Sequence, residues 1–340
     1  MARDARPPAA VAQRLVDQHG RAITYLRLSV TDRCNYRCVY CMAEDMQFMP
    51  RDELMSLDEL ATIAEAFVNL GVHKIRLTGG EPLVRPGIVP LVARLARLSG
   101  LRELTLTTNG AHLAKLAQPL KQAGLSRINV SLDSLQPDRF KALTRTGKLA
   151  EVLAGIRAAQ DAGFERIKLN SVILRGRNDD EVLPLVYFAR SQGLDIAFIE
   201  EMPLGVIHEH DRATSFVSSA EILASIAQRH PLQATTETSG GPARFHRMAD
   251  SPVRIGVISP HSHNFCGTCN RVRVTADGKL MLCLGHDAAV DLGAVLRAHP
   301  DEPSRLSQAI TQAMQTKPAQ HHFNLNAPPQ IIRFMSATGG

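Results

Sequence analysis

The chain has 340 residues, a hydrophobic content of 44% and a formal net charge of +6, with no Trp and only 4% aromatic residues. This length allows one large domain or two ordinary ones around an aliphatic core. The sequence lacks a signal-peptide core and any run of transmembrane length, and its six cysteines fall in two tight groups of three, which excludes a disulfide framework. We therefore expect a soluble, cytoplasmic protein. Its positive charge fits a solvated basic surface or an anionic partner, either nucleic acid or polyphosphate.

The first 200 residues read as alternating strands and helices. Residues 1–20, rich in Ala and carrying Pro7-Pro8, predict a flexible extension. Strand-like runs then follow at 25–31, 74–78, 103–108, 127–133, 166–173 and 195–202. Helix-like runs lie between them, the first after a capping box of Ser56 and Glu59, and the others at about 88–98, 112–123, 150–162 and 180–192. Such βα repeats predict a parallel sheet, either open or closed into a partial barrel.

Side-chain alternation along the strands favours the barrel. The first strand places Leu26 and Leu28 on one face and Arg27 and Ser29 on the other, and the next four strands also keep one polar face. Parallel strands are usually apolar on both faces, so the polar faces would line a shared interior. We therefore predict an open, six-stranded barrel with a polar cavity. Cations on these faces predict an anionic occupant; they are Arg27, Arg76 and Lys168.

A first cysteine trio, Cys34-x3-Cys38-x2-Cys41, follows the first strand. A [4Fe–4S] cluster normally takes four thiolates, so three would leave one iron open for a small molecule. Zinc with a distant fourth ligand, or redox and structural thiols, are the alternatives. One βα unit later comes Thr78-Gly79-Gly80-Glu81-Pro82, where two glycines allow close backbone approach to a ligand and Glu81 offers an acceptor for an amine.

A second trio, Cys266-x2-Cys269 with Cys283, lies near the C-terminus. Asp277-Gly278 predicts a hairpin that joins 271–275 to 279–284 and returns Cys283 to the other two cysteines. A zinc knuckle is the open alternative here, with His261, His263 or His286 as its fourth ligand. The preceding region is less regular, with a turn at Gly240-Gly241-Pro242 between short strands. Helices are expected at 290–298 and 302–315.

The first trio with its Gly-Gly-Glu-Pro segment resembles the radical S-adenosylmethionine (SAM) enzymes. Both trios together, with the terminal Gly-Gly, resemble the GTP 3′,8-cyclase family of molybdenum cofactor biosynthesis from about residue 20 onward. The resemblance implies a partial (βα)6 TIM-type barrel over 21–205 and a cluster-bearing region over 206–340. It implies two [4Fe–4S] clusters, the first binding SAM and the second binding guanine. Their ligands would be Cys34, Cys38 and Cys41, and Cys266, Cys269 and Cys283.

The resemblance also implies contact residues, several of which lie on the polar faces described above. SAM would be bound by Tyr40, Gly80, Ser131 and Met202. GTP would be bound by Arg27, Arg76, Thr107, Lys168, Arg271, Val272 and Arg273. Gly339 and Gly340 would insert into the barrel near both reactants. Thr338 departs from the apolar Ile that is more usual in the family tail, which puts the strength of docking in doubt.

The implied reaction begins when a deoxyadenosyl radical removes the 3′ hydrogen of GTP. The C3′ radical then attacks C8, and reduction gives (8S)-3′,8-cyclo-7,8-dihydroguanosine 5′-triphosphate. The implied partners are GTP, a low-potential electron donor and the next pathway enzyme, with a homodimer left open and neither membrane nor nucleic acid expected. The rival interpretations are a radical SAM enzyme acting on a peptide or RNA, and a zinc-dependent nucleic-acid-binding protein.

Overall fold

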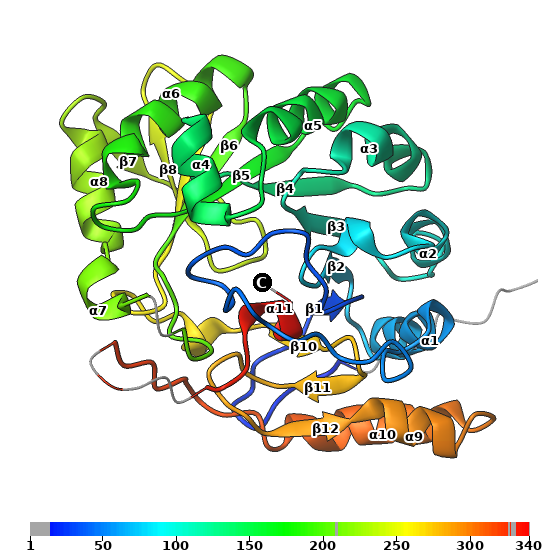
Figure 1. The fold of residues 1–340 in the computed structure, drawn as a ribbon. Helices are drawn as coiled ribbons and strands as arrows, with labels where there is room; N and C mark the ends of the chain where they lie inside the picture. The colour runs from blue at the N-terminus through cyan, green and yellow to red at the C-terminus, as the bar shows by residue number, and fades with distance from the viewer. Residues whose placement is uncertain (1–13, 208–209, 326, 328–330, 340) are drawn as a thin grey trace, which may run out of the picture.

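The computed structural model describes residues 14–207, 210–325, 327 and 331–339, built around one twelve-stranded sheet. The strands run in the order β12-β11-β10-β1-β2-β3-β4-β5-β6-β9-β8-β7. Eight of these pair in parallel and curve into an open barrel (Figure 1). They are β10 (Arg271–Val274), β1 (Tyr25–Ser29), β2 (Lys74–Thr78), β3 (Glu103–Thr108), β4 (Arg127–Ser131), β5 (Ile167–Val172), β6 (Asp195–Ile199) and β9 (Arg254–Ile258).

The predicted partial barrel is confirmed, and two strands from the C-terminal half extend it. β10 pairs with β1 and β9 pairs with β6, so the later part of the chain adds one parallel strand at each edge. Antiparallel strands then continue each edge outward. They are β11 (Lys279–Met281) and β12 (Ala289–Asp291) beyond β10, and β8 (Arg244–Met248) and β7 (Leu232–Ala234) beyond β9. The predicted hairpin at Asp277-Gly278 is the β10–β11 connection.

Helices surround the barrel on its outer side (Figure 1). They are α1 (Leu57–Asn69), α2 (Ile88–Leu95), α3 (Leu113–Gln122), α4 (Pro137–Thr144), α5 (Leu149–Asp161), α6 (Val182–Gln192), α7 (Arg212–Ser215), α8 (Ser219–Ala227), α9 (Leu292–Ala298) and α10 (Pro303–Met314). The sequence did not predict α4. Short 3-10 turns lie at Pro82–Val84, Asp179–Glu181 and Cys266–Thr268. None of the described helices is both long enough and apolar enough to cross a membrane.

The outward faces of the strands form the core because their apolar side chains meet the surrounding helices. Leu26 and Leu28 of β1 and Ile75 of β2 are fully buried there. Helix α1 begins at the predicted capping box: Ser56 Oγ accepts from Glu59 N at 3.1 Å, and Glu59 Oε2 accepts from Ser56 N at 2.7 Å. The inward faces remain polar and line the barrel interior.

The two ends of the described chain pack against the barrel. Leu15 is buried, and Val16 forms an antiparallel bridge with Ala22, so residues 14–20 are not the loose extension that we predicted. At the other end, α11 (Met335–Thr338) lies inside the ring of strands (Figure 1). The last segment of the chain therefore occupies the interior rather than the surface.

Candidate active site

The first cysteine trio lies in the loop after β1, and all three sulfur-bearing side chains line one pocket at the carboxyl ends of the strands. The Gly-Gly-Glu-Pro segment after β2 holds this loop through main-chain hydrogen bonds. Gly80 N donates to Thr31 O at 2.9 Å, and Glu81 N donates to Arg33 O at 2.8 Å. Main-chain hydrogen bonds between the segments that follow β1 and β2 thus fix the position of the cysteine loop.

The two glycines also have a packing role that the sequence did not predict. A Cβ on Gly79 would lie 2.5 Å from Thr31 O, and one on Gly80 would lie 2.4 Å from Arg33 O. Gly79 also has φ +155°, at the edge of the range that L side chains rarely adopt. The glycines are therefore needed for close approach of the cysteine loop, and both also line the wall of the first pocket.

Glu81 is likewise occupied within the protein. Its Oε1 accepts from Leu83 N at 2.9 Å and from Thr108 Oγ1 at 2.8 Å, and its Oε2 accepts from Asn109 N at 2.6 Å. Burial raises the pKa of this carboxyl to about 7, although the three hydrogen bonds oppose the rise. The carboxyl group lines the pocket, where we predicted an acceptor for an amine, and its hydrogen bonds also make it an anchor that joins the β2 and β3 ends.

The donor set of the first trio fits an iron–sulfur cluster. The three cysteines are free, and burial raises the pKa of Cys34 to about 11 and that of Cys41 to about 12. Such thiols would bind metal only with release of their protons. In a cube each thiolate binds its own iron, so three of them hold three irons and leave the fourth for another ligand.

The predicted SAM-binding residues, Tyr40, Gly80, Ser131 and Met202, all line this same pocket. Tyr40 donates its hydroxyl proton to Asp133 Oδ2 at 2.7 Å, and Asp133 Oδ1 accepts from Val172 N at 2.8 Å. Asn170 Oδ1 is a buried acceptor on the pocket wall that has no hydrogen-bond partner among the described residues. A buried acceptor of this kind is costly unless a ligand donates to it, which fits a polar cofactor.

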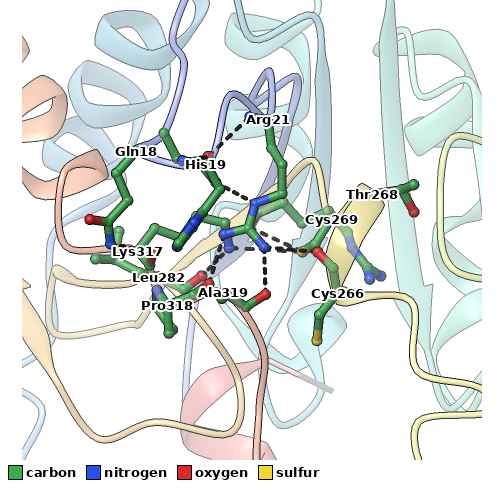
Figure 2. Close-up of polar contacts among 12 residues, drawn as sticks. Gln18, His19, Arg21, Cys266, Thr268, Cys269, Leu282, Lys317, Pro318 and Ala319 are labelled. Carbon is green, nitrogen blue, oxygen red and sulfur yellow. Dashed lines mark hydrogen bonds and ion pairs between the residues drawn. The ribbon is translucent and has the colours of Figure 1, made fainter.

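The second trio lines a second pocket, which extends toward the amino ends of the strands. Cys266 lies in the 3-10 turn before β10, and Cys283 follows β11, so the hairpin returns it as predicted. Figure 2 shows Cys266 and Cys269 beside Arg21 and Lys317, with Lys317 Nζ 3.8 Å from Cys269 Sγ. Burial would raise the pKa of Cys269, but the positive charges of Arg271 and Lys317 outweigh it and lower this pKa.

The histidines that could complete a zinc knuckle do not gather with the second trio among the described residues. Within the described ranges, no three His, Cys, Asp or Glu side chains gather closely enough to hold a single metal ion. His261 Nε2 contacts Glu201 O at 2.8 Å, and His286 Nε2 contacts Gln320 O at 3.0 Å, so both candidate ligands have backbone partners. His263 is exposed. The three sulfurs instead suit a cluster, in which the ligands bind separate irons.

Cations dominate the second pocket. All of the predicted GTP-binding residues line it: Arg27, Arg76, Thr107, Lys168, Arg271, Val272 and Arg273. Lys74 adds a further cation that sequence reasoning did not include in the site. The alternation argument is thereby confirmed for Arg27, Arg76 and Lys168, which share one cavity although they come from three different strands.

This concentration of charge shifts the pKa values of its members. Burial, followed by the nearby charge of Arg76, lowers the pKa of Lys168 to about 7. Burial would raise the pKa of Tyr25, but the cations Arg76, Arg27 and Lys74 together lower it to about 7. The Tyr25 hydroxyl accepts from Arg76 Nε at 2.5 Å. A polyanion entering this pocket would relieve the mutual repulsion of the cations.

The two pockets adjoin. They share a set of lining residues, Thr107, Asn170, Ile199, Met202 and Met335. Molecules bound at the two trios would therefore meet at this common wall, with a residue of the C-terminal tail between them.

The C-terminal tail is held in the interior by the same cations. Gly339 O accepts from Arg27 Nη2 at 3.1 Å and from Arg273 Nη1, which also donates to Thr338 O. A Cβ on Gly339, whose φ is +75°, would lie 2.1 Å from Thr78 Oγ1. Thr338 is buried, and its hydroxyl donates to Met335 O at 3.3 Å, so its polarity is satisfied in place. Gly340 lies outside the described residues.

Sequence reasoning missed several residues of this interior. Tyr25 and Lys74 are on strands whose polar face was already recognised, so their alternation could have identified them. Asp133 continues the polar face of β4 just beyond the strand, and Asn170 lies on the polar face of β5. Met335 carried no such signal, because no strand or helix pattern precedes it in the tail.

Comparisons with known proteins agree with this architecture. Residues 28–189 match the model of the Radical SAM superfamily, and residues 194–323 match that of Molybdenum Cofactor Synthesis C. A crystal structure of Streptococcus suis SuiB bound to S-adenosylmethionine is similar in fold, with a TM-score of 0.60 and 12% identity over 92% of this chain and 79% of that one. A partial barrel with a three-cysteine loop after its first strand and this superfamily match defines the chain as a radical SAM enzyme.

Sequence relatives specify the family. A GTP 3′,8-cyclase of Pseudomonas entomophila is 61% identical over 96% of this chain and 98% of its own length. GTP 3′,8-cyclase 2 of Pseudomonas aeruginosa is 58% identical over 96% of this chain and 99% of its own length. The chain belongs to the GTP 3′,8-cyclase family.

Proposed function

We propose that the protein converts GTP to (8S)-3′,8-cyclo-7,8-dihydroguanosine 5′-triphosphate, the first step of molybdenum cofactor biosynthesis. The observation that carries this proposal is the shared wall between a thiol-lined pocket and a cationic, thiol-lined pocket. A reaction in which one bound molecule takes a hydrogen atom from another requires such contact.

The protein uses two [4Fe–4S] clusters and SAM. At the first trio, a cluster would supply the electron that splits SAM and yields a radical able to remove hydrogen. Cys34, Cys38 and Cys41 would hold that cluster. The protein's own task there is to position SAM and to exclude water from the reacting atoms.

Four residues would orient SAM. Gly80 and Ser131 line the first pocket and would contact SAM there, and Met202, which lines both pockets, would lie between the two reactants. Tyr40 is held by Asp133, which fixes its ring against the cysteine loop. Because Asp133 is buried and also accepts from Val172 N, the Tyr40 side chain has one strongly favoured position.

The second pocket would bind GTP. Cys266, Cys269 and Cys283 would hold the second cluster, whose open iron would take the guanine. The triphosphate would pair with the cations Arg27, Arg76, Lys168, Arg271 and Arg273, since charge-assisted contacts are the strong hydrogen bonds of phosphate recognition. Thr107 and Val272 would complete the wall beside the nucleoside.

The tail would seal the site. Gly339 bonds to Arg27 and Arg273, so bound GTP and the tail would use the same guanidinium groups. By the family resemblance Gly339 and Gly340 would both act in catalysis, although Gly340 lies outside the described residues. A packed tail over a radical intermediate would keep it from solvent until the ring closes.

Several finer features belong to the same proposal. Residues 21–205 would form the SAM-binding barrel and residues 206–340 the substrate-side region, a division supported by the two family matches. A low-potential electron donor must feed the first cluster, and the next pathway enzyme would accept the product. Action in the cytoplasm and assembly as a homodimer are also part of the proposal.

Anaerobic reconstitution tests the proposal. The protein should hold about eight iron atoms and no zinc per chain, as two four-iron clusters require. With GTP, SAM and a reductant it should form 5′-deoxyadenosine and the cyclic product. Zinc in the second trio, or turnover of SAM without any change in GTP, would contradict it.

A further inference from the structure

Lys317, which follows α10, carries a buried charge without a carboxylate partner. Lys317 is 2% exposed. Its ammonium donates to Leu282 O at 2.5 Å and contacts Cys269 Sγ at 3.8 Å (Figure 2). In the part of the chain that the structure describes, no Asp or Glu forms an ion pair with it. The acidic group that the ammonium does contact is the thiol of Cys269, a cysteine of the second trio.

A buried ammonium needs compensation. Removing a charge from water is costly, and a hydrogen bond to one neutral carbonyl recovers only part of that cost. Leu282 O supplies one hydrogen bond, which leaves two of the three ammonium protons without a strong acceptor. A thiolate at Cys269, bound to iron, would supply the missing negative charge at the observed position.

Arg21 supports the same loop from the N-terminal side. Its guanidinium donates to Cys266 O at 2.8 Å, to Ala319 O at 2.8 Å and to Pro318 O at 2.7 Å. Asp17, itself buried, accepts from Arg21 Nε at 2.6 Å and so sets the direction of the guanidinium. One side chain thereby joins the N-terminal segment, the cysteine loop and the start of the C-terminal tail (Figure 2).

The N-terminal segment also reaches Lys317 directly. Gln18 Nε2 donates to Lys317 O at 2.9 Å, so the backbone that carries the ammonium is held at the residue itself. The same segment forms a tight turn, in which Asp17 Oδ1 accepts hydrogen bonds from His19 N and Arg21 N. Lys317 and Arg21 are thus placed by one rigid assembly, although they lie 296 positions apart in the printed sequence.

We propose that Lys317 and Arg21 are positioning residues of the second iron–sulfur site. Lys317 donates to the ligand thiolate of Cys269 and offsets the charge of the cluster, while Arg21 fixes the backbone of Cys266. This inference rests on the proposed function, because it requires a cluster at the second trio.

Two consequences follow from general principles. A hydrogen bond and a positive charge at a ligand sulfur withdraw electron density from the cluster and raise its reduction potential. Loss of the Arg21 contacts frees the Cys266 loop and should speed loss of the cluster, since groups that orient metal ligands typically change metal affinity by about 10- to 100-fold. The two residues therefore predict two separable effects.

The experiment uses the full-length chain with Cys34, Cys38 and Cys41 all changed to Ser, so that any cluster belongs to the second trio. Into this background go Lys317→Met, Lys317→Gln, Lys317→Arg and Arg21→Gln, with Lys115→Met as the matched control at an exposed lysine of α3. Iron and sulfide content, the midpoint potential from an EPR-monitored reductive titration, and the rate of iron loss to a chelator are measured without GTP or SAM.

We expect the parent and the Lys115→Met protein to hold about four iron atoms. The Lys317→Met and Lys317→Gln proteins should show a more negative midpoint potential, and Lys317→Arg should restore it. Arg21→Gln should lose iron about tenfold faster. If neither neutral variant retains iron but Lys317→Arg does, the requirement for a positive charge is likewise supported.

Three results would overturn the inference. One is a parental midpoint potential in cluster-holding Lys317→Met and Lys317→Gln proteins. Another is equal loss of iron in all three Lys317 variants, including the arginine, which would reduce Lys317 to a packing role. The third is a parent that holds no cluster, and in that case the proposed substrate site fails as well.

Discussion

The two ends of the barrel interior each carry three cysteines beside polar strand faces, but the charges of their other side chains differ. At the carboxyl ends of the strands, the first pocket carries the carboxyl groups Glu81 and Asp133 and three cysteines. Toward the amino ends, the second pocket carries Arg27, Lys74, Arg76, Lys168, Arg271 and Arg273 with the other three cysteines. Under the proposed function, the same polar strand faces would bind a cationic sulfonium cofactor at one end and a polyanion at the other.

Burial has opposite consequences at these two ends. At the first, it raises the pKa of Asp133 to about 6 and of Glu81 to about 7, so both carboxyl groups lose part of their charge near neutral pH. At the second, it lowers the pKa of Lys168 to about 7. A positively charged ligand at the first end would favour the ionised carboxylates, and a polyanion at the second would favour protonated Lys168.

The largest expected effect comes from separating the two ends through their cysteines. Cys266→Ser should abolish cyclic product while 5′-deoxyadenosine still forms slowly, because the first trio remains intact. Cys34→Ser is the control and should abolish both products. Product analysis by liquid chromatography after anaerobic turnover decides this, and wild-type cyclisation by Cys266→Ser would show that the two ends are not functionally distinct.

The C-terminal tail lines both pockets, so a change that distorts it should uncouple SAM cleavage from GTP cyclisation. Gly339→Ala would place a Cβ 2.1 Å from Thr78 Oγ1, in addition to a left-handed strain of about 1–2 kcal/mol. We expect cyclic product per 5′-deoxyadenosine to fall at least about tenfold, the equivalent of about 1.4 kcal/mol. Gly163→Ala has a similar φ of +80° but no atom within 4 Å of its Cβ, so the ratio should stay unchanged there.

At the cationic end, Lys168→Met should weaken GTP binding about tenfold. A hydrogen bond to a charged group contributes about 1.5–3 kcal/mol, and methionine keeps the shape of the side chain. Equilibrium binding of GTP under anaerobic conditions measures this, while SAM affinity should not change. An equal loss in the exposed control Lys115→Met would point to general charge rather than to this contact.

GTP affinity should also fall as pH rises from about 7 to 9. Lys168 loses its proton above its pKa of about 7 in the empty pocket, and Tyr25 becomes negative in the same range. Each change opposes a polyanion, so binding must take up the protons again, at up to about tenfold in affinity per pH unit for each one. Titration calorimetry in buffers of different ionisation enthalpy measures this uptake.

Single variants assign the two protons. Lys168→Met and Tyr25→Phe should each remove part of the uptake, and the double variant should remove most of it. No change in either would mean that these groups keep a constant charge, and the described pKa shifts would then have no bearing on binding.

The smallest effect should come from a change remote from both ends. Ser56→Ala removes the side-chain acceptor of the α1 capping box and should lower the free energy of unfolding by about 1 kcal/mol. Denaturant unfolding measures this. Affinities for GTP and SAM should match those of the wild type, and a change in either would indicate coupling between α1 and the interior.

The strand faces and the cysteine loops could be predicted from sequence because each depends on local spacing. Arg27, Arg76 and Lys168 were placed inside by alternation alone, and the hairpin at Asp277-Gly278 by its turn residues. The Ser56 cap was likewise a local signal that the structure confirms.

Other features depend on contacts between distant segments, which no local pattern contains. β9 joins the barrel because it pairs with β6, and nothing in its own sequence marks it as parallel. Gly79 and Gly80 line the first pocket, but their close approach to Thr31, Asp32 and Arg33 was not predicted, because it joins two separate loops. The Arg21 and Lys317 contacts join the two ends of the chain, so only the folded structure could reveal them.

The central claim is that the two pockets bring SAM and GTP into contact within one cavity. The most direct test is anaerobic turnover with GTP deuterated at C3′ of the ribose, followed by mass analysis of the 5′-deoxyadenosine. The account predicts that deuterium from C3′ appears in the 5′-deoxyadenosine, in step with formation of the cyclic product. Cyclic product formed while the 5′-deoxyadenosine carries no deuterium would contradict it.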